Sequence, residues 1–424
     1  MSIGVLQPTF DRWGGAEWFI HGLLEQLEAR GHEVVLYTHR WSPPPGGGAR
    51  YAVVEHRYGG VLSHPWDWRR IARTLAGRWS EHDVLFVHNY PATLWYAEAH
   101  ARGGAPPAVW YCHEPPAALH DPAAAAPDLP LTGAAGGRWA ALRFYRSRAL
   151  WRLVSRLRAR TGKAPGREEL IDRERAAVGL FRAVLANSRF TADRVERLYG
   201  RRAEVVPPVP ADLHRLAPAA PPRKEPLVLW VGRLTEAKRP LLMLDAWREA
   251  RRREPAVRAH RLLIVGEGPL AEEVARRVRE DRSAAHASRL PREELVARYR
   301  AARLTVHLGR DEPFGLVPVE AMACGCAVLA AAEGGVVETV EPGVTGHLIE
   351  RPDRDALAAR LAALLREPEA LDRMGAAAAR RVRARFDPSA TLAAVERALA
   401  TARADKSAGG GDPPRRVPTP PVRS

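Results

Sequence analysis

Short apolar runs alternate with amphipathic stretches through the first half of the chain. Residues 3–7 (Ile-Gly-Val-Leu-Gln) and 34–37 (Val-Val-Leu-Tyr) are typical of buried strands, and apolar positions at 19–27 between them follow helical spacing. A Gly14-Gly15 loop separates the first strand from that helix. The order strand, glycine loop, helix, strand predicts the start of a parallel α/β sheet. Further strands are predicted at 84–87, 109–112 and 183–186.

The same alternation restarts in the second half, after a stretch rich in proline and alanine at 207–226 that is typical of an interdomain linker. Helices are predicted near 240–253, near 292–302 and through 354–401, and strands at 227–231, 262–265, 304–307 and 327–330. The predicted fold class is therefore α/β, with two Rossmann-like, doubly wound parallel-sheet domains that face a central cleft. We expect the divisions 1–206, 207–226 (linker), 227–385, 386–405 (a C-terminal helix that could return to the first domain) and 406–424 (a disordered tail).

The composition is that of an ordinary folded protein, with 46% hydrophobic and 27% charged residues among 424. The three cysteines have no metal-ligand spacing and cannot build a disulfide framework, so a reducing cytoplasm is the expected compartment. The N-terminus lacks the basic and apolar regions of a signal peptide, and no run of about 18 apolar residues occurs. We therefore expect no membrane-spanning segment.

The net charge of +16 is concentrated in two segments. Residues 129–167 hold ten basic and no acidic residues, and the stretch from 401 to the end adds a net +3. Because the rest of the chain is nearly balanced, a local anionic partner is favoured over a nucleic-acid track across the whole surface. An arginine- and alanine-rich composition would explain part of the excess equally well.

The basic segment includes the stretch 138–160, in which the pattern from Ala149 to Arg160 is amphipathic. Arginines recur there every four residues, apolar residues gather on the opposite side, and Trp139, Phe144 and Trp151 lie among them. A basic helix with aromatic residues is typical of peripheral contact with anionic lipid at the inner face of a membrane. A solvated helix packed on its own domain fits the pattern as well, and the sequence leaves both interpretations open.

Two glutamates eight residues apart form the strongest candidate for chemistry, in the segment Glu312-Pro-Phe-Gly-Leu-Val-Pro-Val-Glu320. Glu312 lies on a loop after a predicted strand, and Glu320 follows Pro318, a residue favoured in the first turn of a helix. Carboxylates so placed can accept hydrogen bonds from neighbouring hydroxyls of a sugar or a ribose. Glu320 is equally explained by its interaction with the helix dipole.

Cations and glycines follow strands elsewhere in the chain. Arg233 and Lys238 lie five residues apart after the strand at 227–231, where they could bind a diphosphate; a solvated loop is the alternative. Gly14 and Gly15 would allow backbone N–H groups to approach phosphate oxygens. His113 directly follows the strand at 109–112 and could bind a substrate hydroxyl or move a proton, although a packed histidine is the alternative.

Together these motifs resemble family 4 glycosyltransferases across roughly residues 3–385. The E-x7-E signature of that family is matched by Glu312 and Glu320. The other motifs occur in the family's order: Ala186-Asn187-Ser188, Gly232-Arg233 with Lys238, Val265-Gly266-Glu267-Gly268-Pro269, and Gly334-Gly335 with Glu338, Gly343 and Gly346. The resemblance implies a GT-B fold, no metal requirement and no cofactor, and retention of anomeric configuration.

The resemblance also implies roles for individual residues. Arg233 and Lys238 would bind the donor diphosphate, with the backbone of Gly14 and Gly15 close to it. Glu312 would hold the donor sugar. Glu320 would bind the ribose, His113 would contact the sugar from the acceptor side, and Phe314, Gly315, Leu316, Gly334 and Gly335 would complete the donor pocket.

Three features depart from the family pattern. Leu308-Gly309 stand where Pro-Ser is common, and Pro207-Pro-Val-Pro210 replaces the usual Asn-Gly-Val-Asp before the linker. The basic segment 129–167 matches no family motif. Any acceptor or membrane role for that segment is therefore inferred from its charge alone.

The expected function is transfer of a hexose from a nucleotide diphosphate sugar to a saccharide or lipid-linked acceptor. The Tyr-Cys-His113-x-Pro stretch resembles GDP-mannose-dependent α-mannosyltransferases, which makes GDP-mannose the expected donor. Alternatives are a GT-B sugar phosphorylase, a nucleotide-sugar epimerase, a catalytically silent scaffold, or a basic nucleic-acid-binding module. No nucleic-acid partner is expected, because the charge excess is local.

Overall fold

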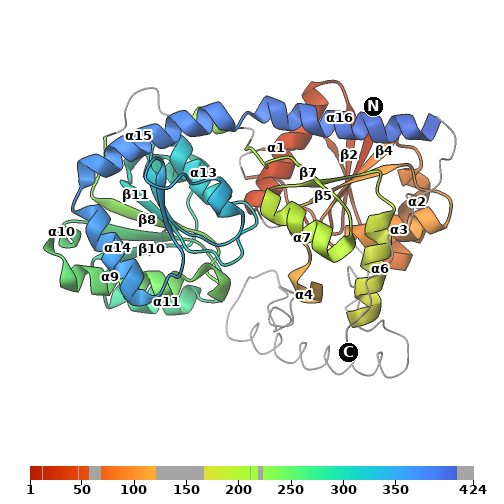
Figure 1. Ribbon diagram of the computed structural model, residues 1–424. Coiled ribbons are helices and arrows are strands. Elements are labelled where there is room, and N and C mark those ends of the chain that lie inside the picture. Colours follow the sequence, from red (N-terminus) through yellow and green to blue (C-terminus); the bar gives the residue numbers. More distant parts are fainter. Residues whose placement is uncertain are drawn as a thin grey trace.

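The computed structural model describes residues 1–11, 13–45, 47–56, 68–120, 167–210, 212–217 and 223–407. These residues form two lobes, each built on one parallel β-sheet with helices packed against it (Figure 1). The two sheets confirm the predicted α/β class with two doubly wound halves.

The N-terminal sheet has seven described strands in the order β3-β2-β1-β4-β5-β6-β7, all parallel. Its strands are β1 (Ser2–Leu6), β2 (Glu33–Thr38), β3 (Ala52–Glu55), β4 (Val84–His88), β5 (Ala108–Cys112), β6 (Ala183–Ala186) and β7 (Glu204–Val205). The helices of this half are α1 (Gly15–Ala29), α2 (Trp68–Trp79), α3 (Ala92–Ala101), α4 (Ala117–His120), α6 (Arg167–Gly179) and α7 (Arg189–Tyr199).

The C-terminal sheet has six described strands in the order β10-β9-β8-β11-β12-β13, also parallel. They are β8 (Leu227–Val231), β9 (Arg261–Val265), β10 (Ala284–Ala287), β11 (Leu304–His307), β12 (Ala327–Ala331) and β13 (Gly346–Ile349). Its helices are η1 (Glu236–Lys238), α9 (Pro240–Arg253), α10 (Pro255–Arg258), α11 (Ala271–Arg279), α12 (Arg292–Ala301), α13 (Leu316–Ala323), η2 (Gly335–Glu338), α14 (Arg354–Leu365) and α15 (Pro368–Arg385).

The central strands carry the apolar runs because helices cover both of their faces. Every residue of β4, β5 and β12 is buried. Each sheet reverses its strand order at its first strand, between β1 and β4 in one half and between β8 and β11 in the other. Loops at the carboxyl ends of the strands diverge at such a reversal and leave room for a ligand.

The chain passes between the halves twice. The first passage, predicted as a linker at 207–226, contains the short helix α8 (Leu213–Leu216). The second lies between α15 and α16 (Pro388–Ser407), where α16 returns along the N-terminal sheet (Figure 1). Val395 and Leu399 of α16 are fully buried in the core of that sheet. α16 continues to Ser407, two residues into the segment expected to be a disordered tail.

Two of the sequence expectations fall largely outside the described residues. These are the basic segment 129–167, of which Arg167 is described as the first residue of α6, and the tail after Ser407. The expected membrane-binding helix at 138–160 lies wholly outside them. Within the part of the chain that is described, no helix is long and apolar enough to cross a bilayer.

Candidate active site

An ammonium group and a carboxylate meet at the carboxyl edge of the C-terminal sheet. Lys238 is the last residue of η1, which follows β8, and Glu312 lies five residues after β11. The Lys238 Nζ donates to Glu312 Oε2, and the two side chains are 28% and 13% exposed. The structure therefore brings together two of the residues that the sequence singled out for diphosphate and sugar binding.

His307 joins this pair, although the sequence analysis assigned it only to a strand. The ring nitrogen Nε2 of this buried residue lies 3.0 Å from Glu312 Oε2. Burial alone would raise the pKa of the Glu312 carboxyl, but the Lys238 charge and the His307 hydrogen bond outweigh it and hold that pKa well below its usual range. Glu312 is therefore an anion that two donors hold at one oxygen.

The backbone of Glu312 is packed against the glycine loop after β12. The Gly335 amide donates to the Glu312 carbonyl at 2.7 Å. A Cβ on Gly334 would lie 2.3 Å from that same oxygen, and one on Gly335 would lie 2.2 Å from the Pro313 carbonyl oxygen. Only glycine fits at these two positions, because any side chain would separate the loops.

Arg239 connects these loops by hydrogen bonds, which the sequence did not indicate. Its guanidinium donates to Glu333 at 2.8 and 3.1 Å and to the Leu308 carbonyl at 3.2 Å. Glu333 directly precedes the glycine pair, and Leu308 directly follows β11. One side chain thus connects the loop of Lys238 to those of Glu312 and Gly334.

The N-terminal half contributes the amino end of α1 to the same region. A Cβ on Gly15 would lie 2.8 Å from Cδ1 of Leu316, the first residue of α13. The Gly14 amide donates to Glu17 Oε2 at 3.1 Å. The Arg233 side chain is exposed, makes no hydrogen bond within the described chain, and interacts electrostatically with Glu17. Gly15, Leu316 and Arg233 therefore lie where the two halves approach each other.

His113 and Glu114 extend the site from the end of β5. Burial lowers the pKa of His113 to about 3, and its Nε2 lies 3.1 Å from Nδ1 of the buried His88. Burial raises the pKa of Glu114, which also experiences the charges of Lys238 and Glu312 in the other half. The carboxyl end of β5 therefore faces the Lys238–Glu312 pair, and the His113 imidazole is neutral near pH 7.

Glu320 makes its contacts away from this cluster. It lies on α13, where Arg292 Nη1 donates to it at 2.7 Å and the Tyr299 hydroxyl lies 3.4 Å away. Arg292 also contacts Asp212 at 3.2 Å. Burial raises the pKa of Glu320 in spite of the Arg292 charge. As a ribose ligand, Glu320 would have to share its carboxylate with Arg292.

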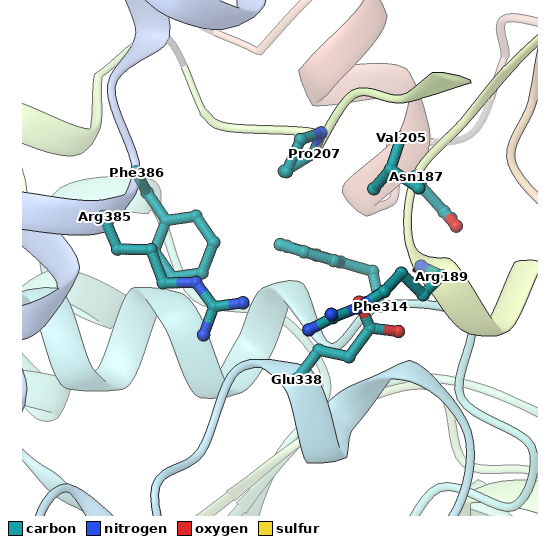
Figure 2. Close-up of a pocket in the computed structure, with 8 residues that line it drawn as sticks. All are labelled: Asn187, Arg189, Val205, Pro207, Phe314, Glu338, Arg385 and Phe386. Carbon is teal, nitrogen blue, oxygen red and sulfur yellow. Dashed lines mark hydrogen bonds and ion pairs between the residues drawn. The ribbon is translucent and has the colours of Figure 1, made fainter. Parts of the chain in front are cut away.

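Phe314 belongs to a pocket of about 300 Å³ beside the site (Figure 2). Its ring packs edge-on against Phe386 at a centroid distance of 5.8 Å, and Gly315, the N-cap residue before α13, has a φ of 94°. Residues of both halves line the pocket: Asn187, Arg189, Val205, Pro207, Phe314, Glu338, Arg385 and Phe386. Since neither Lys238 nor Glu312 lines it, this pocket lies next to the charged cluster and does not contain it.

No three histidine, cysteine, aspartate or glutamate side chains of the described residues are arranged to hold a metal ion.

Family profiles match both halves of the chain. Residues 13–209 match the family described as Glycosyltransferase Family 4, and residues 216–381 match Glycosyl transferases group 1. Each half of the chain therefore matches a glycosyltransferase family, in agreement with the predicted family. The two profiles meet within the passage between the two sheets.

Solved structures share the fold of this chain. Sucrose-phosphate synthase from Thermosynechococcus elongatus superimposes with a TM-score of 0.70 at 19% identity, over 95% of this chain and 99% of that one. Anabaena HepE in complex with UDP-glucose gives a TM-score of 0.65 at 18% identity, over 95% of this chain and 100% of the other. Sequence identities this low show the fold alone.

Curated relatives of this chain are more similar in sequence but match over shorter stretches. The D-inositol 3-phosphate glycosyltransferase of Kribbella flavida is 34% identical over 215 residues, which is 46% of this chain and 51% of the relative. That of Thermobispora bispora is 34% identical over 260 residues, 57% and 60% of the two chains. The chain thus spans about half the length of the curated relatives it matches. These relatives are not named as mannosyltransferases, so the expected mannose specificity stays a prediction.

Proposed function

We propose that this GT-B protein transfers a hexose from a nucleotide diphosphate sugar to a saccharide or lipid-linked acceptor, with retention of anomeric configuration and without a metal ion. The contact of Lys238 with Glu312 at the carboxyl edge of the C-terminal sheet is the observation that carries this proposal. An ammonium group suits the diphosphate, and a carboxylate beside it suits the sugar hydroxyls.

The reaction needs stabilisation of the diphosphate as the glycosidic bond breaks. Lys238, Arg233 and the backbone at Gly334-Gly335 would supply positive charge and N–H groups where that negative charge grows. The acceptor hydroxyl would attack the resulting oxocarbenium-like centre from the face that the diphosphate leaves, and its proton would pass to a diphosphate oxygen. His113 is neutral, so it would bind a hydroxyl by hydrogen bonding and would not act as a cation.

The sequence motifs bear on the sugar donor, and the curated relatives bear on the acceptor. GDP-mannose is the donor that the sequence motifs favour. The relatives named D-inositol 3-phosphate glycosyltransferase favour a phosphorylated polyol as a second candidate acceptor.

Nucleotide release tests the proposal directly. We expect release of the nucleoside diphosphate from one member of a panel of GDP-mannose and UDP-sugars, accelerated by a lipid-linked saccharide or by inositol phosphate. Lys238→Ala and Glu312→Ala should each lose most of the turnover, by about 100-fold or more. Absence of both release and binding with every donor would contradict the function. Wild-type rates in either variant would contradict the role of that residue.

The basic segment at 138–160 is proposed to contact anionic lipid at the inner face of the membrane, where a lipid-linked acceptor would lie. Flotation of the full chain with anionic and with neutral vesicles tests this contact. We expect binding to the anionic vesicles only, and equally negligible binding to both would rule the contact out.

A further inference from the structure

The two carboxylate oxygens of Glu312 have different surroundings. Oε2 contacts both Lys238 Nζ and His307 Nε2. Oε1 has no hydrogen-bond partner within the described chain and is not among its buried unpaired atoms, so it is open to solvent. One oxygen therefore anchors the carboxylate, and the other is available to a ligand.

Gly309 leaves the space in which this anchor forms. A Cβ at position 309 would lie 2.7 Å from Glu312 Oε2, closer than real Cβ atoms approach other atoms, and 3.0 Å from His307 Nε2, which is a tight contact. A side chain there would therefore displace the end of the Glu312 side chain and crowd the imidazole. The departure from Pro-Ser at Leu308-Gly309 thus coincides with a contact that a side chain at position 309 would disturb.

The two partners of Oε2 differ in their freedom to leave it. The Lys238 ammonium lies at the end of a flexible four-carbon side chain that is 28% exposed. The His307 side chain, at the end of β11, is 6% exposed. A diphosphate is a stronger attraction for an ammonium group than one carboxylate oxygen is. When a donor binds, Lys238 can turn toward it, and His307 alone remains on the carboxylate.

We propose that His307 is a positioning residue for Glu312: its Nε2–H group holds Oε2, so that Oε1 stays directed at the donor sugar while Lys238 binds the diphosphate. This inference rests on the proposed function, which supplies the sugar and the diphosphate. A displacement of about 1 Å of such a carboxylate is enough to slow a reaction by about 100-fold. The donor KM should change little, since the diphosphate contacts stay.

Two substitutions at the same position separate hydrogen bonding from packing. His307→Leu keeps an apolar bulk but removes the donor, and we expect kcat to fall by about tenfold or more while the donor KM changes less than about threefold. His307→Gln offers an N–H group at a similar reach and should keep kcat within about threefold. Gly309→Ala should lower kcat as His307→Leu does.

His260 provides the matched control. As a whole residue, His260 is 6% exposed and His307 is 5% exposed, so the two are equally buried. His260 lies just before β9, at the opposite end of the same sheet. His260→Leu should keep the wild-type kcat, with a melting temperature no higher than that of His307→Leu. The proposal is overturned if His307→Leu keeps the wild-type kcat, or if His307→Gln is impaired as strongly as His307→Leu.

A measurement without any donor sugar keeps this inference separate from the proposed function. Nitrogen-15 NMR of the histidine-labelled full chain reports which ring nitrogen of His307 carries the proton. We expect the Nε2–H form in the wild type, and a shifted Nε2 resonance in Glu312→Gln. An Nδ1–H form would refute the contact. Lack of turnover with every donor, beside the expected NMR result, would refute the function and leave the contact intact.

Discussion

Glu338 accepts a hydrogen bond from the backbone amide of Phe190 at 2.9 Å, across the boundary between the two halves. Its other carboxylate oxygen accepts from the Arg189 amide at 3.1 Å, so a residue of η2 caps the amino end of α7. Nearby, the Ser188 hydroxyl donates to the Pro313 carbonyl at 2.5 Å. Figure 2 shows Glu338 and Arg189 side by side at the pocket. The two loops that carry Gly335 and Glu312 are thereby joined to the N-terminal half.

Removing this cap should weaken the contact between the two halves. Glu338→Ala leaves the amides of Arg189 and Phe190 without acceptors, a loss of about 1 kcal/mol for a helix cap. Hydrogen exchange at Phe190 should become about fivefold faster. Glu341→Ala is the control, because Glu341 pairs with Arg381 within the C-terminal half. Equal exchange at Phe190 in both variants would show that Glu338 does not hold the halves together.

The buried pair His88 and His113 predicts a dependence of stability on pH. An unfolded histidine binds a proton near pH 6.5, whereas burial lowers the pKa of His113 to about 3 in the folded protein. Between these two values the unfolded state holds the extra proton, so stability falls as the pH falls, by about 1.4 kcal/mol per pH unit for each such histidine. Burial likewise keeps the pKa of His88 far below its usual value.

Urea unfolding at pH 7.5, 5.5 and 4.5 measures this effect. His113→Gln should lose less stability between pH 5.5 and 4.5 than the wild type does, by about 1.4 kcal/mol. Parallel losses in the two proteins would mean that His113 takes up its proton in the folded state.

Substitution of Lys224 should lower the stability of the protein without changing the candidate active site. Lys224 is half-buried, and its ammonium donates to three carbonyls, those of Arg300, Ala302 and Gly325, at 2.7 to 3.0 Å. Lys224→Met leaves these carbonyls without their donor, and we expect the free energy of unfolding to fall by about 2–3 kcal/mol. Exposed Arg223→Met should change it by less than about 0.5 kcal/mol. Similar values for both variants would contradict a structural role for Lys224.

Gly266 sets the position of the loop that carries Arg233. A Cβ there would lie 1.8 Å from the Gly232 carbonyl oxygen. Gly266→Ala should therefore displace the loop and weaken binding of a nucleoside diphosphate by about tenfold or more. Gly343→Ala is the control, since Gly343 also has a positive φ of 78° but nothing lies within 4 Å of its Cβ position. Calorimetry that finds equal affinities in the two variants would refute this role of Gly266.

The sequence predicted the central strands of both sheets and missed all four edge strands. β4 and β12 are recognisable because burial on both faces demands a continuous apolar run. β3, β7, β10 and β13 lie at the sheet edges, have fewer buried residues, and are four residues long or shorter. Their sequences contain no apolar run as long as those of β4 and β12, so these segments are recognisable as strands only from their pairing with a neighbouring strand.

For the site, residues on loops after strands could be predicted because the carboxyl ends of parallel strands share one edge of the sheet. Lys238 and Glu312 were found in this way. His307 could not be predicted in this way, because the sequence does not distinguish a functional histidine at the end of an apolar strand from a packed one. Only the structure shows that Gly309 lies beside His307 and Glu312. Arg239 and Glu338 act through partners 94 and 148 residues away in sequence, which spacing within one motif cannot reveal.

Lys238 is expected to bind the donor diphosphate, and titration calorimetry measures this binding without an acceptor. The wild type should bind the nucleoside diphosphate of its donor at least about tenfold more tightly than the corresponding monophosphate. Lys238→Met should remove that preference, while Arg261→Met, which changes an exposed cation at the amino end of β9, should keep it. If Lys238→Met still prefers the diphosphate as strongly as the wild type does, Lys238 does not bind the diphosphate.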